Sequence, residues 1–199
     1  MRSHHKDEDA QATDRMIAEN RDFFRQRSFH LLIWGLLLSA VFGVHSAIAF
    51  GYLAPAPGLG GWTWVATVVV AVVASFLFER YHAISPANIL SRLLLHLWAG
   101  FAVTLVIIGF LGGATALMPG SAHCGSLAAI VGGGFFVSAL LVVSRGLLAL
   151  AMLWWCAAAV MFFLAVQAAL FLMVCLTFGG LFLPGLALYA SYRVRPSGA

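Results

Sequence analysis

Three histidines are the side chains of this 199-residue chain that could most readily support a bound metal ion or haem. We expect His30 and His96 near the same membrane surface and His82 in the loop beside them. Imidazole nitrogens are common metal and haem ligands, so these three could form one site. Histidines near membrane surfaces also serve as ordinary hydrogen-bonding groups, and this spacing is not diagnostic. The sequence therefore assigns no cofactor and keeps the three histidines as candidate ligands.

Other arrangements that carry chemistry are missing from the sequence. No Asp, Glu, Lys or Arg stands in the middle of an apolar stretch, where a titratable group would indicate a proton- or sodium-coupled transporter. No nucleophile has a base at a recognisable spacing, and no glycine-rich phosphate loop is present. His45 with His123 and Cys124 could at most form a small metal site at the opposite surface. We therefore expect a protein that is not an enzyme.

The composition indicates a membrane protein. Hydrophobic residues make up 62% of the chain and charged residues 9%, whereas about 25% of a soluble domain is charged. The formal net charge is +4, but the cations stand at the ends of apolar stretches, where they orient a protein in the bilayer. No basic face remains that could follow a nucleic-acid backbone. We expect contact with lipid, no nucleic-acid partner, and a multi-pass protein of the cell inner membrane.

The predicted fold is all-α, a polytopic transmembrane helical bundle. We expect a cytoplasmic amphipathic segment over residues 1–28, a transmembrane helical domain over 29–192 and a cytoplasmic tail over 193–199. Runs of about 20 apolar residues suffice for one span. The expected spans are 29–52, 62–78, 93–117, 127–143 and two more within 146–192.

The last stretch, 146–192, is 47 residues long without a charge. That length fits two spans with a turn near Ala169, which gives six spans in all. The expected turn contains no Gly, Pro or Asn, so an alternative stays open. In this alternative, one long tilted helix runs to Thr177 and breaks at 179–180, and a short re-entrant piece follows, which gives five spans. With six spans, all eleven Lys and Arg residues fall on one side, which predicts that both termini are inside.

Small residues recur at every fourth position of the first long apolar run. They are Gly35, Ser39, Gly43, Ala47 and Gly51. Side chains four residues apart form one ridge along a helix, and small residues let helix backbones approach closely in lipid. We expect a helix-packing surface here, for another helix of this chain, a second copy or another membrane subunit.

The charged segment before the first span contains no Gly or Pro from residue 10 to residue 28. Apolar residues recur there at roughly helical spacing between charges, which predicts a short amphipathic helix that runs into the span. Phe23, Phe24, Arg25 and Arg27 are candidates for docking a cytoplasmic partner. The simpler alternative is a solvated tail that only orients insertion.

Part of this region resembles a known family. Residues 19–27 (ENRDFFRQR), an apolar span and then residues 52–57 (YLAPAP) are similar to the N-terminal membrane anchor of TraM/DotI/IcmL subunits of conjugative type IV secretion systems. The similar stretch covers about 40 of the 199 residues. That family follows its single span with a periplasmic domain, whereas this chain continues through more spans. The resemblance therefore implies similar partners, not membership, and it transfers no functional residue.

Together these observations predict a non-enzymatic, polytopic inner-membrane subunit of a larger assembly. Secretion or conjugal-transfer machinery is one such assembly. A channel or carrier for a small neutral or apolar solute is the alternative, because such a solute needs no charge within the membrane. A membrane protein that binds haem or metal through His30, His82 and His96 is the second alternative.

Overall fold

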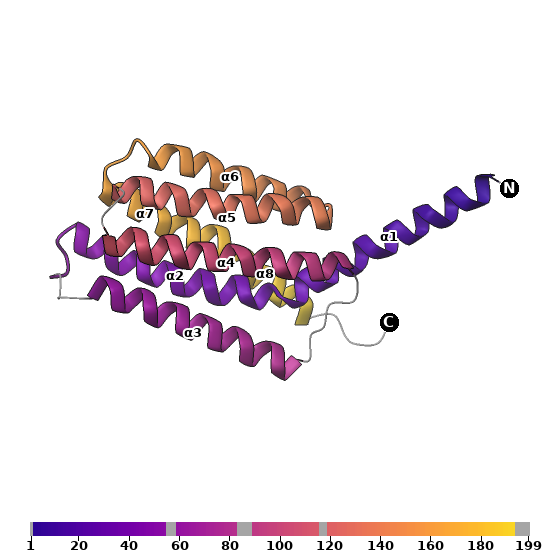
Figure 1. Cartoon of the computed structure of the whole chain (residues 1–199), viewed down its shortest axis with the longest axis horizontal. Helices are drawn as coiled ribbons and strands as arrows, with labels where there is room; N and C mark the ends of the chain where they lie inside the picture. The colour runs from indigo at the N-terminus through magenta and orange to yellow at the C-terminus, as the bar shows by residue number, and fades with distance from the viewer. Residues whose placement is uncertain (1, 55–58, 83–88, 116–118, 194–199) are drawn as a thin grey trace.

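The computed structural model describes residues 2–54, 59–82, 89–115 and 119–193, and these form a helical bundle with no strand among them (Figure 1). The all-α prediction is confirmed. The elements are α1 (Arg2–Gln26), α2 (Ser28–Ala49), α3 (Leu59–His82), α4 (Ile89–Thr115), α5 (Gly120–Val142), α6 (Arg145–Met161), α7 (Val166–Thr177), the π-helical turn η1 (Phe178–Phe182) and α8 (Leu183–Arg193). Most of the predicted tail, 194–199, lies outside the described residues.

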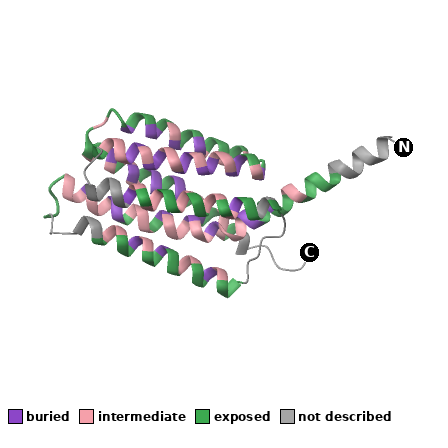
Figure 2. Cartoon of the chain, viewed as in Figure 1, coloured by how far each residue is buried: buried purple, intermediate pink, exposed green. Residues whose placement is uncertain are grey.

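Five helical segments of the described chain are long and apolar enough to cross a membrane. They are Gln11–Ala49, Trp62–His82, Arg92–Gly109, Gly120–Val142 and Val166–Ser191. Helix α6 is apolar but shorter, with 17 residues. The chain therefore has the helices of a multi-pass membrane protein. Helix α3 exposes much of its surface (Figure 2), and its exposed side chains include a run of valines, as expected for contact with lipid.

The apolar stretch from 146 to 192 folds back on itself, so a single long helix to Thr177 is wrong. The turn occupies residues 162–165, a few residues before the expected position. The amides of Phe163 and Leu164 donate to carbonyls three residues earlier. No residue of this turn has a positive φ, so it needs no glycine, and the missing turn residues were no obstacle. The glycines at 179–180 do not break the chain but lie in η1, where the helix widens and continues.

Helix α1 is longer than predicted, and its last turns belong to the bundle. It passes into α2 at Arg27, whose backbone is still close to helical. Phe23 and Phe24 are buried against the other helices, whereas the rest of α1 projects beyond the bundle (Figure 1). The predicted boundary at residue 28 therefore lies inside a packed region.

Helix α1 is anchored to the end of α5. The Asn20 amide donates to the Leu141 carbonyl at 3.4 Å, and Arg21 donates from Nε to Val142 at 3.2 Å and from Nη2 to Val143 at 3.0 Å. The last carbonyls of a helix have no partner within it and attract cations. Asn20 and Arg21 therefore close the end of α5, and this holds α1 in place.

Helix α5 is the centre of the core. It packs on α4, α6 and α7. The largest fully buried side chains are Phe135 of α5 and Trp154 and Met161 of α6. Glycines in α5 make room for aromatic rings of α6, because a β-carbon at Gly132 would lie 2.7 Å from Nε1 of Trp155. The small residues of α5 thus position α6, as expected for helix packing in lipid.

Candidate functional site

The small-residue ridge of α2 divides into two parts. Gly35 lies directly against the backbone of η1, at Leu181 and Phe182. Ser39 donates to Oγ1 of Thr177 at 2.9 Å. These two positions therefore serve packing within this chain, against α7 and η1. Gly185 of α8 makes a similar close approach to α2 from the other side, because a β-carbon there would lie 2.5 Å from the backbone nitrogen of Leu32.

The other half of the ridge makes no such contact. A β-carbon at Gly43 would have no atom within 4 Å in the described chain, and Ala47 is only half-buried. Gly51 lies beyond the end of α2 with a φ of 79°. Its role is that of a turn residue, since this backbone conformation favours glycine. The expectation that five residues act as one surface is therefore wrong for Gly51, because the helix ends before it.

Arg27 and His30 converge on the carboxylate of Glu79. Nη1 of Arg27 lies 2.9 Å from Oε1 of Glu79, and Nε2 of His30 lies 3.0 Å from the same oxygen. The exposed fractions of the three side chains are 12%, 20% and 35%. Helix α3 ends beside the start of α2, which brings these groups together. In so little water the arginine and the carboxylate attract each other strongly and their charges cancel.

Aromatic rings enclose this cluster. The guanidinium of Arg27 stands over the ring of Phe23, 4.7 Å from its centroid. Phe29 and Phe78 stack with centroids 4.2 Å apart, and the ring of His30 meets Phe78 edge-on. A cation over an aromatic face is stabilised further when water is excluded. The rings therefore hold Arg27 and His30 in place.

A cavity of about 240 Å³ opens beside the cluster, between α2, α3 and α4. Three of the five buried side-chain nitrogen or oxygen atoms that lack a hydrogen-bond partner in the described chain belong to residues that line it. These atoms are Nε of Arg27, Nε2 of His30 and Oγ of Ser75. Nε2 of His30 lies 3.0 Å from Oε1 of Glu79, so Nε of Arg27 and Oγ of Ser75 are the two of these atoms that face the cavity without a partner among the described residues. Leaving such a group unpaired costs roughly 1–3 kcal/mol, and folded proteins rarely do so.

The rest of the cavity wall is apolar and continues toward the opposite end of the bundle. Trp34 and Leu38 of α2 also line a second cavity of about 170 Å³, as do Leu105, Val131 and Leu181. The second cavity contains almost no polar surface. Its lining includes Trp154, whose buried Nε1 has no partner among the described residues. The two cavities thus form a polar end and an apolar extension.

The candidate histidine site is not assembled. Nδ1 of His82 lies 3.0 Å from the Phe78 carbonyl, and Nδ1 of His96 lies 2.6 Å from the Arg92 carbonyl on an exposed face of α4. The part of the chain that the structure describes holds no group of three His, Cys, Asp or Glu side chains placed to bind a metal. His30 instead pairs with Glu79. The described residues therefore do not bring the three histidines together as a metal site, because His82 and His96 each contact a carbonyl of their own helix. Haem binding stays a prediction from the sequence.

The candidate docking residues have different roles from those expected. Phe23 and Phe24 are buried within this chain, and Arg27 pairs with Glu79. Only Arg25 remains at the surface, 3.7 Å from Asp22. These aromatic residues therefore cannot form an exposed docking surface, because burial against the bundle uses their apolar area.

Sequence reasoning overlooked Ser75 and Glu79. Glu79 directly follows the expected span 62–78, and the sequence pattern assigned it no role. The position of Glu79 could have indicated its pairing with Arg27. In two antiparallel neighbouring spans, the end of the second span lies beside the start of the first, so Glu79 is at the same depth as Arg27. Ser75 lies one helical turn earlier on α3, on the same face as Glu79.

No family model, curated protein or solved structure matches this chain. The resemblance of residues 19–57 to TraM/DotI/IcmL anchors, and the secretion or conjugation assembly that it implies, therefore stay predictions from the sequence.

Proposed function

We propose that this protein binds a small neutral amphipathic molecule within its helical bundle, as a membrane carrier does. The molecule's oxygen-bearing head contacts Arg27, His30 and Ser75, and its apolar part extends along Trp34 and Leu38. The observation that carries this proposal is that two buried polar atoms without a hydrogen-bond partner in the described chain, Nε of Arg27 and Oγ of Ser75, line one cavity beside His30. This is the alternative of a carrier for a neutral or apolar solute, with its binding site specified.

The charge balance of the site favours a neutral head group. Arg27 and Glu79 already neutralise each other, so an added carboxylate or ammonium would be a buried charge without a partner. A hydroxyl oxygen can accept from Nε of Arg27 and also donate to a neighbouring acceptor. The cavity volumes of about 240 and 170 Å³ fit a head group followed by a slender apolar chain.

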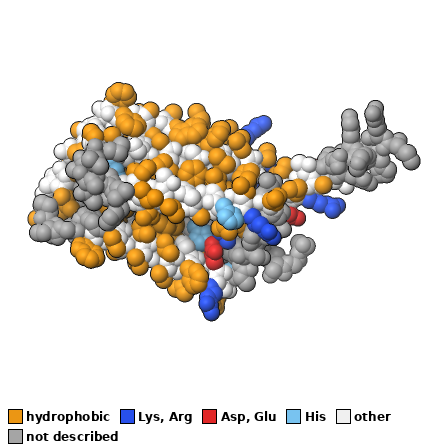
Figure 3. All heavy atoms as spheres, viewed as in Figure 1, with side chains coloured by type: hydrophobic (Ala, Val, Ile, Leu, Met, Phe, Trp, Pro, Cys, Tyr) orange, Lys and Arg blue, Asp and Glu red, His pale blue; other side chains and the backbone are white. Residues whose placement is uncertain are grey.

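We propose six spans, with both termini inside the cell inner membrane. The cations stand at element ends: Arg21 and Arg25 near the end of α1, Arg80 in the last turn of α3, Arg92 in the first turn of α4 and Arg145 at the start of α6. Figure 3 shows the charged side chains of the visible face at the end from which α1 leaves, and apolar side chains over the remainder. Positive charge near span ends marks the cytoplasmic side. Helix α6 would be the short span, since 17 residues extend about 26 Å.

Quenching of tryptophan fluorescence by brominated chains tests the binding site. Purified protein in mild detergent is titrated with bromoundecanol, bromoundecane and bromoundecanoate, which share a chain and differ in the head. We expect saturable quenching by the alcohol, with roughly fivefold weaker binding of the bromoalkane because it lacks the hydrogen-bonding head. We expect weaker binding of the carboxylate as well.

Two tryptophan variants locate the quenched site. Trp34 lines both cavities, whereas Trp155 donates to the Ala129 carbonyl and lines neither. Trp34→Phe should remove a large part of the saturable quenching, and Trp155→Phe should leave it. Quenching that rises linearly with all three probes, or that Trp34→Phe leaves unchanged, would contradict the proposal.

A further inference from the structure

Apart from the two cavities, an open groove of about 1210 Å³ lies at the end of the bundle from which α1 leaves. Its walls are the last turns of α1, the turn between α5 and α6 with the first half of α6, and the face of α8 around Ala187 and Leu188. Phe24 lines both this groove and the buried cavity. The two spaces are therefore neighbours with different walls.

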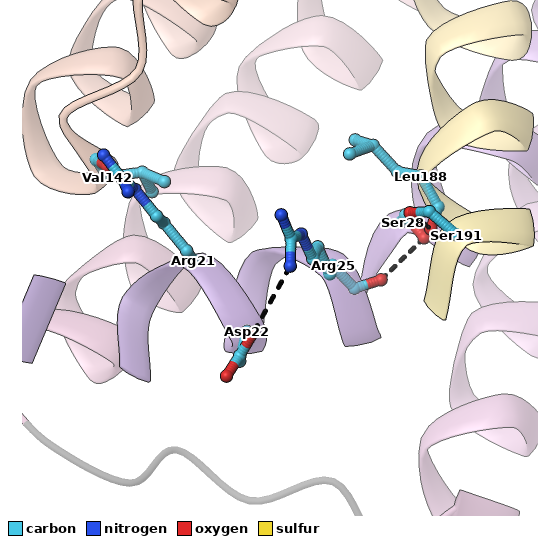
Figure 4. A network of polar contacts seen from close by, with 7 residues as sticks. All are labelled: Arg21, Asp22, Arg25, Ser28, Val142, Leu188 and Ser191. Carbon is cyan, nitrogen blue, oxygen red and sulfur yellow. Dashed lines mark hydrogen bonds and ion pairs between the residues drawn. The ribbon is translucent and has the colours of Figure 1, made fainter. Parts of the chain in front are cut away.

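The mouth of the groove is positively charged. Arg21, Arg25 and Arg145 line it, and the described part of the chain contributes no acidic residue to the lining. Figure 4 shows Arg21 and Arg25 on the same side of α1, toward Val142 and Leu188, while Asp22 points the other way. Asp22 approaches Arg25 only to 3.7 Å. An anion at this position would meet three cations, one of them already fixed by its bonds to the end of α5.

Below the arginines the groove is apolar. Leu147, Leu150 and Leu153 follow one another at three-residue spacing on α6, so they lie along one side of this helix. Leu147 and Leu150 are partly buried against the core, whereas Leu153 is 53% exposed, so the described chain covers this side of α6 only in part. Leu188 and Pro184 of α8 form the facing wall. The groove thus joins a cationic mouth to an apolar channel.

We propose that this groove binds one anionic phospholipid, with its phosphate at Arg25 and Arg145 and an acyl chain along the α6 leucines. Basic pockets between spans at the membrane surface are suited to anionic head groups. A second copy docked about a two-fold axis would bring the same arginines toward each other, and like charges disfavour that arrangement. The charge and the apolar channel together fit a lipid.

Native mass spectrometry of the full chain in mild detergent tests this proposal, with phosphatidylglycerol and phosphatidylcholine as probes. We expect one retained phosphatidylglycerol at concentrations where phosphatidylcholine is not retained. Arg25→Gln with Arg145→Gln should weaken phosphatidylglycerol binding roughly 25-fold, about fivefold for each arginine near a membrane surface. Arg21 is left intact because it also holds α5. Soluble glycerol phosphate should not displace the lipid, since it lacks the chain.

The matched control removes two other arginines from the same end. Arg80→Gln with Arg92→Gln causes the same loss of charge outside the groove, and we expect less than a twofold effect. A channel control fills the apolar part: Ala187→Phe should reduce retention, whereas Ala190→Phe, on the same helix but outside the groove lining, should not. Equal effects of the two arginine pairs, equal retention of both lipids, or a dimer that Ala187→Phe abolishes would each overturn the proposal.

Discussion

Gly35 lies directly against the backbone of Phe182, and no space remains between α2 and η1 for a β-carbon. The first predicted span thus contacts one of the last elements of the chain through bare backbone. This contact also brings Leu181 to the wall shared by both cavities. The close approach therefore shapes the proposed binding site as well as the packing.

Gly35→Ala should destabilise the protein by at least about 2 kcal/mol, because an added methyl group would have to displace backbone and not a flexible side chain. Gly43→Ala is the matched control on the same helix, four residues from Ser39, and its β-carbon would meet no atom of another described element within 4 Å. We expect it to be neutral or slightly stabilising, since alanine favours helix. Midpoints of thermal unfolding in detergent measure both, and equal effects would contradict the division of the ridge.

Ser75→Ala should leave the empty protein as stable as before, or more stable, because the buried hydroxyl has no partner in the described structure. It should nevertheless weaken bromoundecanol binding roughly fivefold through loss of a head-group contact. Ser138→Ala provides the contrast. Ser138 accepts from Nε1 of Trp98 at 3.0 Å, so its loss should cost about 1 kcal/mol of stability. A large loss of stability in Ser75→Ala would show that this hydroxyl has a structural partner.

Glu79→Gln should destabilise the bundle by roughly 1–3 kcal/mol, because Arg27 would keep its charge at 12% exposure without its carboxylate. Adding Arg27→Met to Glu79→Gln should recover most of that loss, since the double variant has no unpaired charge. Unfolding midpoints of the two single variants and the double variant form a double-mutant cycle that isolates the pair. Additive losses would mean that the two side chains act independently.

Reporter fusions test the six-span topology. Alkaline phosphatase, active only outside the cytoplasm, should be active when fused after Leu53 and after Phe163, and inactive after Arg145 or at the C-terminus. A fluorescent protein that matures only inside should give the opposite pattern. The fusion after Phe163 is decisive because it reports whether α6 crosses. Phosphatase activity at the C-terminus would contradict the proposed orientation.

Apolar run lengths predicted the helical class and most element positions, because in lipid every backbone group must be satisfied within a helix or a closed barrel. The same reasoning placed the turn near Ala169, since length alone cannot locate a turn that contains no glycine or proline. The structure places it at 162–165. The alternative with one long helix expected a break at the glycines 179–180, where the helix instead widens and continues.

The candidate site was harder to predict because it depends on pairing across helices. Four-residue spacing identified Gly35 correctly as a close-packing position, but could not distinguish it from Gly43, which points away from the rest of the chain. The pairing of Arg27 with Glu79 requires knowing which spans are neighbours. Phe23 and Phe24 were predicted to dock a partner, because no pattern in the sequence shows that the last turns of α1 pack into the bundle.

The bracing of α5 by α1 also fixes an order of events during synthesis. Asn20 finds its partner 121 residues later, at Leu141, and Gly35 finds its own only when Phe182 has been made. The first span to leave the ribosome is therefore the last to gain its full set of neighbours. Until η1 has been made, the side of α2 that carries Gly35 has no helix packed on it. A chain that stops before residue 178 would therefore expose this side to lipid and to membrane proteases.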